Sequence, residues 1–256
     1  MRITRSRSAS RASLAVGGAL ALVALGGSLA AGSLAAGPPN GPVPDVTVRV
    51  EGLSKTLLAP TTVTLRRGAV TKGVASESCS ALSALGALDD ATHGGWGGSW
   101  SKSYKQYFLT AILGQSYAST ASYYWAFWLD NKPAPVGACE VDPAKGSSIL
   151  FFPEYDGKSK TIHAPNVLGI SAPAGTLVGK PVTLLVTSYA NANGKPTPAV
   201  GATVTAGSER TTAKAGGKAT VTLSKPGKVE IRVTAAGSLR DETTLCVHAP
   251  GKTCAG

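Results

Sequence analysis

The sequence predicts a mainly β protein, in which an α+β domain with one helix precedes a small β-sandwich. Three observations support this fold class. Runs of alternating valine and polar residues recur along the chain, only one stretch shows helical spacing, and turn-forming residues are frequent, with 31 glycines and 16 prolines among 256 residues. Alternation is typical of half-buried strands, and short strands separated by turn signals favour a sandwich or barrel.

The first 36 residues differ in kind from the rest and resemble no folded element. Four arginines within the first eleven residues precede an uncharged apolar stretch (14–31), and small residues follow. This is the pattern of a secretory signal peptide, with cleavage after Ala30 or Ala35. A retained N-terminal anchor is the alternative, but the many alanines and glycines make the stretch weakly hydrophobic for a membrane span. We expect removal of residues 1–36, secretion to the extracellular space or the cell wall, and no stable membrane anchor afterwards.

The net charge of the chain, and the way its basic residues are distributed, limit the classes of partner that it is expected to bind. Removing the four arginines of the signal lowers the formal net charge from +11 to +7. The remaining basic residues are scattered, which is typical of a solvated surface and favours weak adsorption to anionic cell-wall polymer. We expect no nucleic-acid partner, because the sequence has neither a dense basic patch nor a recognisable reading motif.

Four cysteines in an exported protein predict two disulfides, with three possible pairings. Cys246 and Cys254 bracket the turn-forming stretch VHAPGKT, so we expect them to close a small loop that clips the C-terminus, residues 249–256. That leaves Cys79 with Cys139.

The first domain is expected over residues 46–157, after an extended proline-rich linker at 37–45. Its first strand alternates three valines, at Val46, Val48 and Val50, with polar residues, which predicts a half-buried strand. A second strand is expected over 61–65. The order predicted for this domain is two strands, a helix, then at least three strands.

The predicted helix follows the second strand. Ser76 or Ser78 is suited to cap its start, and the glycines of 92–95 end it. The residues that recur at helical spacing, and would face the sheet, are Cys79, Leu82, Leu85 and Leu88.

The aromatic half of the first domain begins with a glycine-rich segment, HGGWGGSW (93–100), which we interpret as a loop. Residues 104–114 and 123–131 are expected as strands, with Asp-Asn-Lys-Pro forming the turn after the second. The run 146–153 is expected as an apolar strand that stops at Pro153. Beyond it, short alternating runs separated by glycine, proline and Asn-Gly turns predict the β-sandwich over 164–248.

Residues 123–153, YYWAFWLDNKPAPVGACEVDPAKGSSILFFP, resemble the signature half of the DUF4430 family, which is related to the C-terminal domain of transcobalamin and intrinsic factor. The resemblance covers about residues 46–156 and implies a β-grasp-like fold. The helix with Cys79 and the Gly-Ala-Cys at 137–139 resemble a secreted actinobacterial branch of that family. Gly146-Ser147 stands where the family often has Gly-Asp. The second domain is similar, more loosely, to bacterial Ig-like or carboxypeptidase-regulatory-like modules.

The resemblance does not imply a cofactor. Cobalamin carriers hold their ligand between a large helical barrel and this small domain, and the sequence has no helical array to form such a barrel. We therefore expect no cobalamin and no other cofactor.

The aromatic run 123–129 is the main candidate for a functional surface. Alternation places Trp125 and Phe127 on one face and Tyr124 and Trp128 on the other. Packing in the core and between domains is the favoured interpretation, because large aromatic residues of small domains are usually buried. The alternative is an aromatic surface for a flat or sugar-like ligand. Its candidate residues are Trp96, Trp100, Tyr124 and Trp128.

The sequence offers little for catalysis or metal binding. Its three histidines, His93, His163 and His248, fall in a loop, a linker and the terminal disulfide loop, and no Gly-x-Ser-x-Gly motif occurs. The carboxylate pairs Asp89-Asp90 and Glu140 with Asp142 lie at a helix end and beside a disulfide. The cysteine spacing suits no zinc site, and no phosphate-binding loop is present. We expect no enzyme activity and no metal.

The function expected from the sequence is therefore non-catalytic binding outside the cell or at its surface. The ligand class stays open between a carbohydrate, another small molecule and an extracellular protein. A purely structural or adhesive role, with every aromatic residue in the core, is the first alternative. An enzyme of an unrecognised kind is the second.

Overall fold

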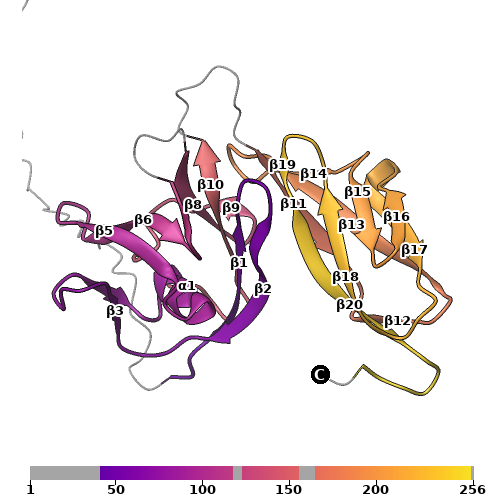
Figure 1. The fold of residues 1–256 in the computed structure, drawn as a ribbon, viewed down its shortest axis with the longest axis horizontal. Coiled ribbons are helices and arrows are strands. Elements are labelled where there is room, and N and C mark those ends of the chain that lie inside the picture. Colours follow the sequence, from indigo (N-terminus) through magenta and orange to yellow (C-terminus); the bar gives the residue numbers. More distant parts are fainter. Residues whose placement is uncertain (1–40, 118–122, 156–164, 255–256) are drawn as a thin grey trace, which may run out of the picture. The chain divides into compact units, whose positions relative to one another are not determined.

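A computed structural model describes residues 41–117, 123–155 and 165–254 (Figure 1). The expected signal peptide, His163 and the predicted domain ends at 157 and 164 lie outside the described residues. Within them, strands dominate and a single α-helix is present, so the predicted fold class is confirmed. We call residues 45–155 the first module and residues 166–248 the second module.

The first module is built on a mixed sheet of five strands in the order β2-β1-β10-β8-β9. At its centre β1 (Asp45–Glu51) runs parallel to β10 (Ser148–Tyr155) and antiparallel to β2 (Thr56–Thr64). The aromatic strand β8 (Tyr123–Leu129) pairs antiparallel with β10 and turns back into the two-residue strand β9 (Lys132–Pro133). A parallel central pair with a helix on one face is what a β-grasp-like fold requires.

The helix α1 (Ala84–Thr92) begins later than the sequence predicts. Its cap is Ser83, whose side chain accepts a hydrogen bond from the Gly86 amide at 3.2 Å, in place of Ser76 or Ser78. The predicted end is confirmed, because the C-cap residue His93 adopts the left-handed conformation that stops a helix.

Cys79, expected in the helix, lies instead in a short ribbon. It is the middle residue of β4 (Ser78–Ser80), which pairs with β3 (Ala69–Thr71). The backbone groups of this segment are thus satisfied across the ribbon before the helix begins.

The prediction of a loop for the glycine-rich segment 93–100 is also wrong, because most of this segment forms a strand. β5 (Trp96–Ser101) pairs antiparallel with β6 (Gln106–Ile112), which continues into β7 (Gln115–Ser116). A side chain at Gly98 would meet the Phe108 carbonyl oxygen at 2.9 Å. Glycine therefore allows the close strand approach here, rather than flexibility.

The core of the first module lies between the central sheet and α1. Leu85 and Leu88 of the helix are fully buried against Val48 of β1 and Phe151 of β10. Trp125, Phe127 and Leu129 of β8 join this core, which confirms the predicted face of the aromatic strand.

β10 does not stop at Pro153, as the sequence suggests, but continues to Tyr155. Pro153 lies opposite Trp125 in the antiparallel pair with β8. The Phe127 carbonyl oxygen accepts a hydrogen bond from the Ala134 amide, so the backbone groups of Phe127 point away from β10. The direction of these groups repeats every second residue along a strand, so those of Trp125 also point away from β10. Pro153 thus occupies a position that needs no N–H, and the strand continues past it.

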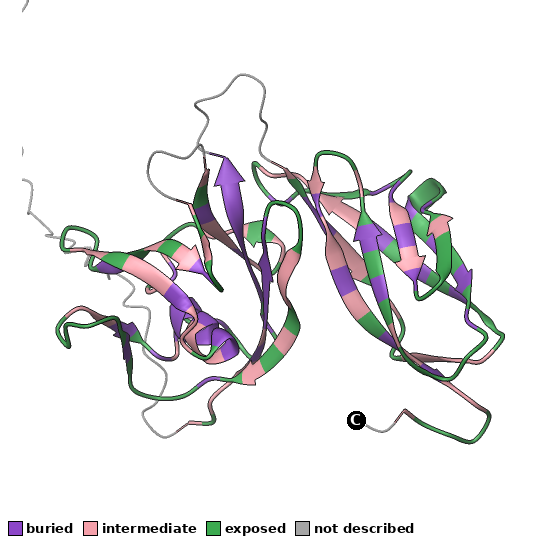
Figure 2. Cartoon of the chain, in the orientation of Figure 1, coloured by how far each residue is buried: buried purple, intermediate pink, exposed green. Residues whose placement is uncertain are grey.

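The second module is a sandwich of two sheets, as predicted. Buried and exposed residues alternate along its strands, and the buried ones meet between the sheets around Leu184, Val204 and Ile231 (Figure 2). One sheet has β14 (Pro196–Pro198), β13 (Pro181–Tyr189), β11 (Asn166–Ser171) and β19 (Ser238–Leu239), with β17 (Lys218–Thr222) also on β13. The other has β12 (Gly175–Leu177), β20 (Asp241–His248), β18 (Gly227–Thr234), β15 (Thr203–Ala206) and β16 (Glu209–Thr212).

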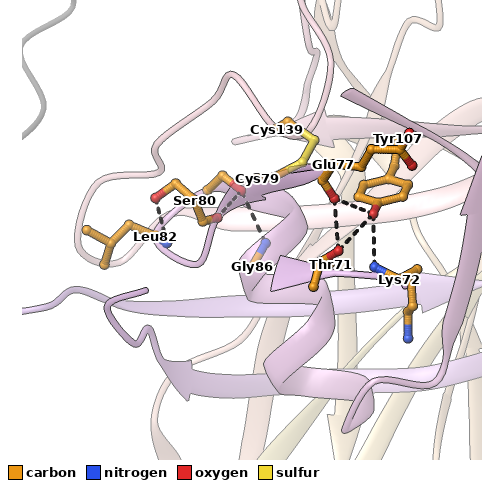
Figure 3. The surroundings of a disulfide bond; sticks show 10 residues. Thr71, Lys72, Glu77, Cys79, Ser80, Leu82, Gly86, Tyr107 and Cys139 are labelled. Carbon is orange, nitrogen blue, oxygen red and sulfur yellow. Dashed lines mark hydrogen bonds between the residues drawn. A yellow bond between two sulfur atoms is a disulfide. The ribbon is translucent and has the colours of Figure 1, made fainter. Parts of the chain in front are cut away.

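The two disulfides have the predicted pairing. Cys79 is bonded to Cys139 across 60 residues, and Cys246 to Cys254 across 8 residues. The first ties the β3-β4 ribbon to the segment after β9 (Figure 3). Among the described residues, no helix has the length and apolar character needed to cross a membrane.

Contacts between the modules bury residues that the sequence placed at the surface. Trp128 and Phe152 pack against Val167 and Leu239 of the second module. The first strand is therefore buried on both faces and not half-buried, because the second module supplies partners for its polar side chains. Arg49 is paired with Asp241 at 2.5 Å, and Glu51 with Arg240 at 3.0 Å.

Candidate functional site

A hollow of about 480 Å³ lies beside β8, lined mostly by the first module and in part by the second. Its volume is in the range of small-molecule sites. Four consecutive residues of β6 (106–109) and five of β8 (124–128) line it, together with residues between 133 and 138. Glu154, Tyr155, Asn191 and Ala192 complete the lining. We call this cavity the β6-β8 hollow.

The lining residues of β8 show which side of the strand faces the hollow. Successive side chains of a strand point to opposite faces of the sheet, so a cavity on one face would touch only alternate residues. The β6-β8 hollow touches five residues in a row, 124–128, and four in a row on β6, 106–109. It therefore follows the edges of these two strands, and it also reaches across β8 to Glu154 and Tyr155 of β10.

Among the residues that the structure describes, each of these edges is only partly covered by another strand. Among the described residues, β6 pairs with β5 on one side, and on its other side β7 joins only at Ala111 and Ile112. β8 pairs with β10 along its length, whereas β9 covers only Trp128 and Leu129. A hydrogen bond from Ala134 to the Phe127 carbonyl oxygen, at 3.3 Å, extends this cover by one residue.

Two lining residues of the hollow each have a buried polar side-chain atom that lacks a partner in the described part of the protein. Gln106 Oε1, an acceptor, and Trp125 Nε1, a donor, are both buried and without a hydrogen bond there. Their residues are 9% and 7% exposed. Such atoms cost free energy unless a bound group or water satisfies them.

Glu154 is the one residue of the lining that carries an acidic or basic side chain. It is 7% exposed, and burial raises the pKa of its carboxyl group above the ordinary value. Asn191 Nδ2 donates to its Oε2 at 2.7 Å, and the Tyr155 amide donates to its Oε1 at 3.1 Å, which opposes the rise. No basic side chain forms an ion pair with Glu154 among the residues the structure describes.

Gly137 brings the backbone close against Gln106 in this region. A Cβ atom at position 137 would lie 1.2 Å from Gln106 Oε1. The glycine is therefore required by space and not by backbone conformation, and any larger residue must displace the Gln106 side chain.

Two of the four predicted ligand-binding residues line the hollow. Tyr124 is 50% exposed and Trp128 is 2% exposed, its ring packed 6.1 Å from that of Phe152. Trp96 and Trp100 lie elsewhere, each in an edge-to-face contact with Tyr107, at 5.3 and 5.0 Å between ring centroids. Trp96 is further fixed because its Nε1 donates to Asp89 Oδ1 at 2.8 Å.

Tyr107 anchors β6, and thus one wall of the hollow, to the disulfide region (Figure 3). Its hydroxyl donates to the Glu77 carbonyl oxygen and accepts from the Lys72 amide at 2.9 Å. Glu77 lies two residues before Cys79, so the cross-link to Cys139 and this hydrogen-bond network stiffen the same segment.

The structure does not bring the candidate residues His93, His248 and the Asp89-Asp90 pair together in one site. His93 is an exposed helix cap, and His248 ends β20, far along the sequence in the other module. Asp89 and Asp90 are occupied by Arg66, and no group of three or more His, Cys, Asp or Glu residues suited to a metal ion occurs in the described part.

Sequence reasoning missed most of the lining residues. Gln106, Phe108, Glu154 and Asn191 come from three separate regions, and no local pattern connects them. The sequence signal that coincides with the hollow was the concentration of aromatic residues in β8.

Comparisons with known proteins give limited likeness. No curated protein matches the chain. A solved structure of a candidate metal-binding protein from Ruminococcus gnavus ATCC 29149 is 11% identical and covers 44% of this chain and 97% of its own, with a TM-score of 0.31. No function is transferred from a similarity that low. Residues 80–152, from the β3-β4 ribbon to β10, match the family model DUF4430, a domain of unknown function.

Proposed function

We propose that this protein is a non-catalytic binding module whose ligand occupies the β6-β8 hollow. The observation that carries the proposal is the combination of an aromatic cavity with the unpartnered polar atoms of Gln106 and Trp125. Ligand sites are typically apolar concavities with a few polar groups that fix orientation. A ligand that reaches these two atoms would offset the free-energy cost of burying them without a partner.

We also propose that the protein works outside the cytoplasm. Two disulfides fit an oxidising compartment, and the first 36 residues have the composition of a signal peptide. N-terminal sequencing of protein recovered from the culture medium checks this. Export with cleavage after Ala30 or Ala35 gives a chain that begins at Ala31 or Ala36, whereas an N-terminus at Met1 in the cell pellet contradicts the proposal.

The binding proposal is tested by intrinsic tryptophan fluorescence of the oxidised protein. All four tryptophans lie in the first module, and two of them, Trp125 and Trp128, line the hollow. A panel of oligosaccharides, corrinoids, organic amines and short peptides is titrated. We expect at least one class to change the fluorescence saturably, and the absence of any binding would favour the structural role.

Two variants place the binding in the hollow. Tyr124→Ala removes an exposed aromatic wall, and we expect it to weaken binding by about tenfold, a loss typical of a contact residue of this size. Gly137→Ala forces Gln106 to move, and we expect a comparable loss.

Matched controls separate these effects from damage to the fold. Leu185→Ala removes an exposed apolar side chain in the second module, and Gly97→Ala adds a Cβ whose nearest neighbours lie at ordinary distances of 3.6 and 3.7 Å. Both controls should bind as the unmodified protein does. Equal losses in variants and controls would place the ligand elsewhere.

A further inference from the structure

We propose that the ligand of the β6-β8 hollow is an extended peptide segment carrying a lysine or arginine, which adds as a strand to the open edge of β8. This rests on the proposed function and specifies its ligand. Strand addition to a sheet edge is a general mode of peptide recognition, in which backbone hydrogen bonds give affinity and side-chain contacts give specificity.

The first argument is the position of the cavity along two strand edges. Residues 124–128 of β8 and 106–109 of β6 line it without interruption. An edge presents a row of backbone donors and acceptors, which proteins normally cover or blunt with charge or proline. Here, among the described residues, neither covering strand reaches the middle of the hollow, because β7 ends the cover of β6 at Ala111 and β9 that of β8 at Trp128.

The backbone groups available on β8 follow from the hydrogen bond at Phe127. Its carbonyl oxygen accepts from Ala134, so Phe127 faces away from β10. Because this direction repeats every second residue, the N–H of Phe127 and both groups of Trp125 point to the same open side. An added strand therefore finds two donors and one acceptor in the spacing that an antiparallel or parallel partner requires.

The second argument is charge. Glu154 is the single residue of the lining with an acidic or basic side chain, and it has no basic partner among the described residues. Glu154 is paired with Tyr124 across β8 and β10, so it lies one strand in from the open edge, level with Tyr124. A basic side chain of the added strand would compensate this carboxylate and pack its stem against the aromatic ring of Tyr124.

The proposal is tested with acetylated and amidated peptides of the sequence Thr-Val-Lys-Val-Thr, titrated by fluorescence against the full mature chain. Companion peptides replace the lysine with arginine, glutamine or glutamate. We expect lysine and arginine peptides to bind about tenfold or more tightly than the glutamine peptide, a difference of about 1.4 kcal/mol, and the glutamate peptide to bind most weakly. Glu154→Gln should abolish the preference for the basic residue, so that the lysine, arginine and glutamine peptides bind this variant with equal affinity.

Pairing by the backbone is tested separately from the charge. Methylating alternate amide nitrogens of the lysine peptide removes its donors on one side, and we expect this to reduce binding about tenfold or more in one of the two alternating patterns. Hydrogen exchange gives a second measurement. The amides of Trp125 and Phe127 should become protected when the peptide binds, whereas those of Ala126 and Trp128, which face β10, should not change.

The outcomes distinguish this proposal from the one on which it rests. If an oligosaccharide or a corrinoid binds in the hollow and no peptide does, the peptide assignment is overturned and the binding function stands. Peptide binding that is indifferent to methylation in both patterns also overturns strand addition. If nothing binds, both proposals fail.

Discussion

At the scale of single residues, the most unusual feature is a set of buried charges that sequence patterning assigns to the surface. Arg49 and Glu51 alternate with valines in β1, as exposed residues of a half-buried strand would, yet they are 7% and 0% exposed. Glu51 is held by Arg49 at 3.6 Å and by Arg240 at 3.0 Å. Burial outweighs these two charges and the hydrogen bond from Thr56, and it raises the pKa of Glu51 from 4.5 to about 7.

This shift predicts a specific dependence of stability on pH. Because the pKa is higher in the folded state, folding takes up a proton at Glu51 between pH 4.5 and 7. The stabilisation from protonated Glu51 is complete below about pH 4.5 and is lost as the pH rises through 7. We expect the free energy of unfolding of the unmodified protein, minus that of Glu51→Gln, to fall by up to about 3 kcal/mol over this interval, measured by urea denaturation.

The matched control is Glu230→Gln. Glu230 is also paired with an arginine, Arg232 at 2.8 Å, but its side chain is 61% exposed. The difference between the unmodified protein and this variant should stay flat between pH 4.5 and 7. A flat difference for Glu51→Gln as well would show that its pKa is not raised.

At the scale of elements, the first module is held together by one helix, three sheets and a cross-link. The disulfide from Cys79 to Cys139 ties β4 to the segment after β9, and Tyr107 links β6 to the same region through its hydroxyl group. The result is a fixed separation between β6 and β8, on which the shape of the hollow depends. The second disulfide closes only a short loop after β20.

The two cross-links should differ in their contribution to stability. In the chain-entropy model, a cross-link restricts the unfolded chain more when it spans more residues, and the spans are 60 and 8. We expect the double variant Cys79→Ser with Cys139→Ser to lose about 4 kcal/mol of unfolding free energy, and Cys246→Ser with Cys254→Ser about 2.5 kcal/mol. Urea denaturation measures both, and an equal or larger loss at the C-terminal loop would contradict the model.

At the scale of the described molecule, the two modules share a small apolar core. Trp128 and Phe152 of the first module pack with Val167 and Leu239 of the second, and Tyr189 lies against them. The ion pairs of Arg49 and Arg240 surround this core with further contacts. If one module unfolded, the apolar residues of the other module in this shared core would become exposed to water, which would lower the stability of the second one to unfold.

We therefore expect the modules to unfold in one cooperative transition. Val182 lies in the core of the second module, whereas all four tryptophans lie in the first. Val182→Ala should lower the midpoint of urea denaturation seen by tryptophan fluorescence as well as that seen by circular dichroism, by an amount that corresponds to about 2 kcal/mol. Val200→Ala, at a valine that is 64% exposed, should change neither midpoint. If only circular dichroism responded to Val182→Ala, the modules would unfold independently.

The sequence by itself was sufficient to predict features that depend on a pattern repeated along one segment, and features such as disulfide pairing for which few alternatives exist. Alternation identified the sheets of both modules and the core-facing side of β8, and four cysteines at two very different separations gave the observed pairing. The Asp-Asn turn after β8 was predicted because these residues tolerate the positive φ that both adopt, 49° and 63°.

Tertiary structure alone decided the features that depend on contacts between distant segments. The helix α1 begins only after Ser83, because the residues around Cys79 pair with β3 as a strand. The glycine-rich segment forms β5 because its backbone pairs with β6. Arg49 and Glu51 are buried because a second module lies over them, and the same module covers Trp128, for which the sequence favoured packing in the core and between domains. The β6-β8 hollow has the same origin: its walls come from strands, a loop and a second module that are separated in sequence, and the open strand edges exist only after the sheets have formed.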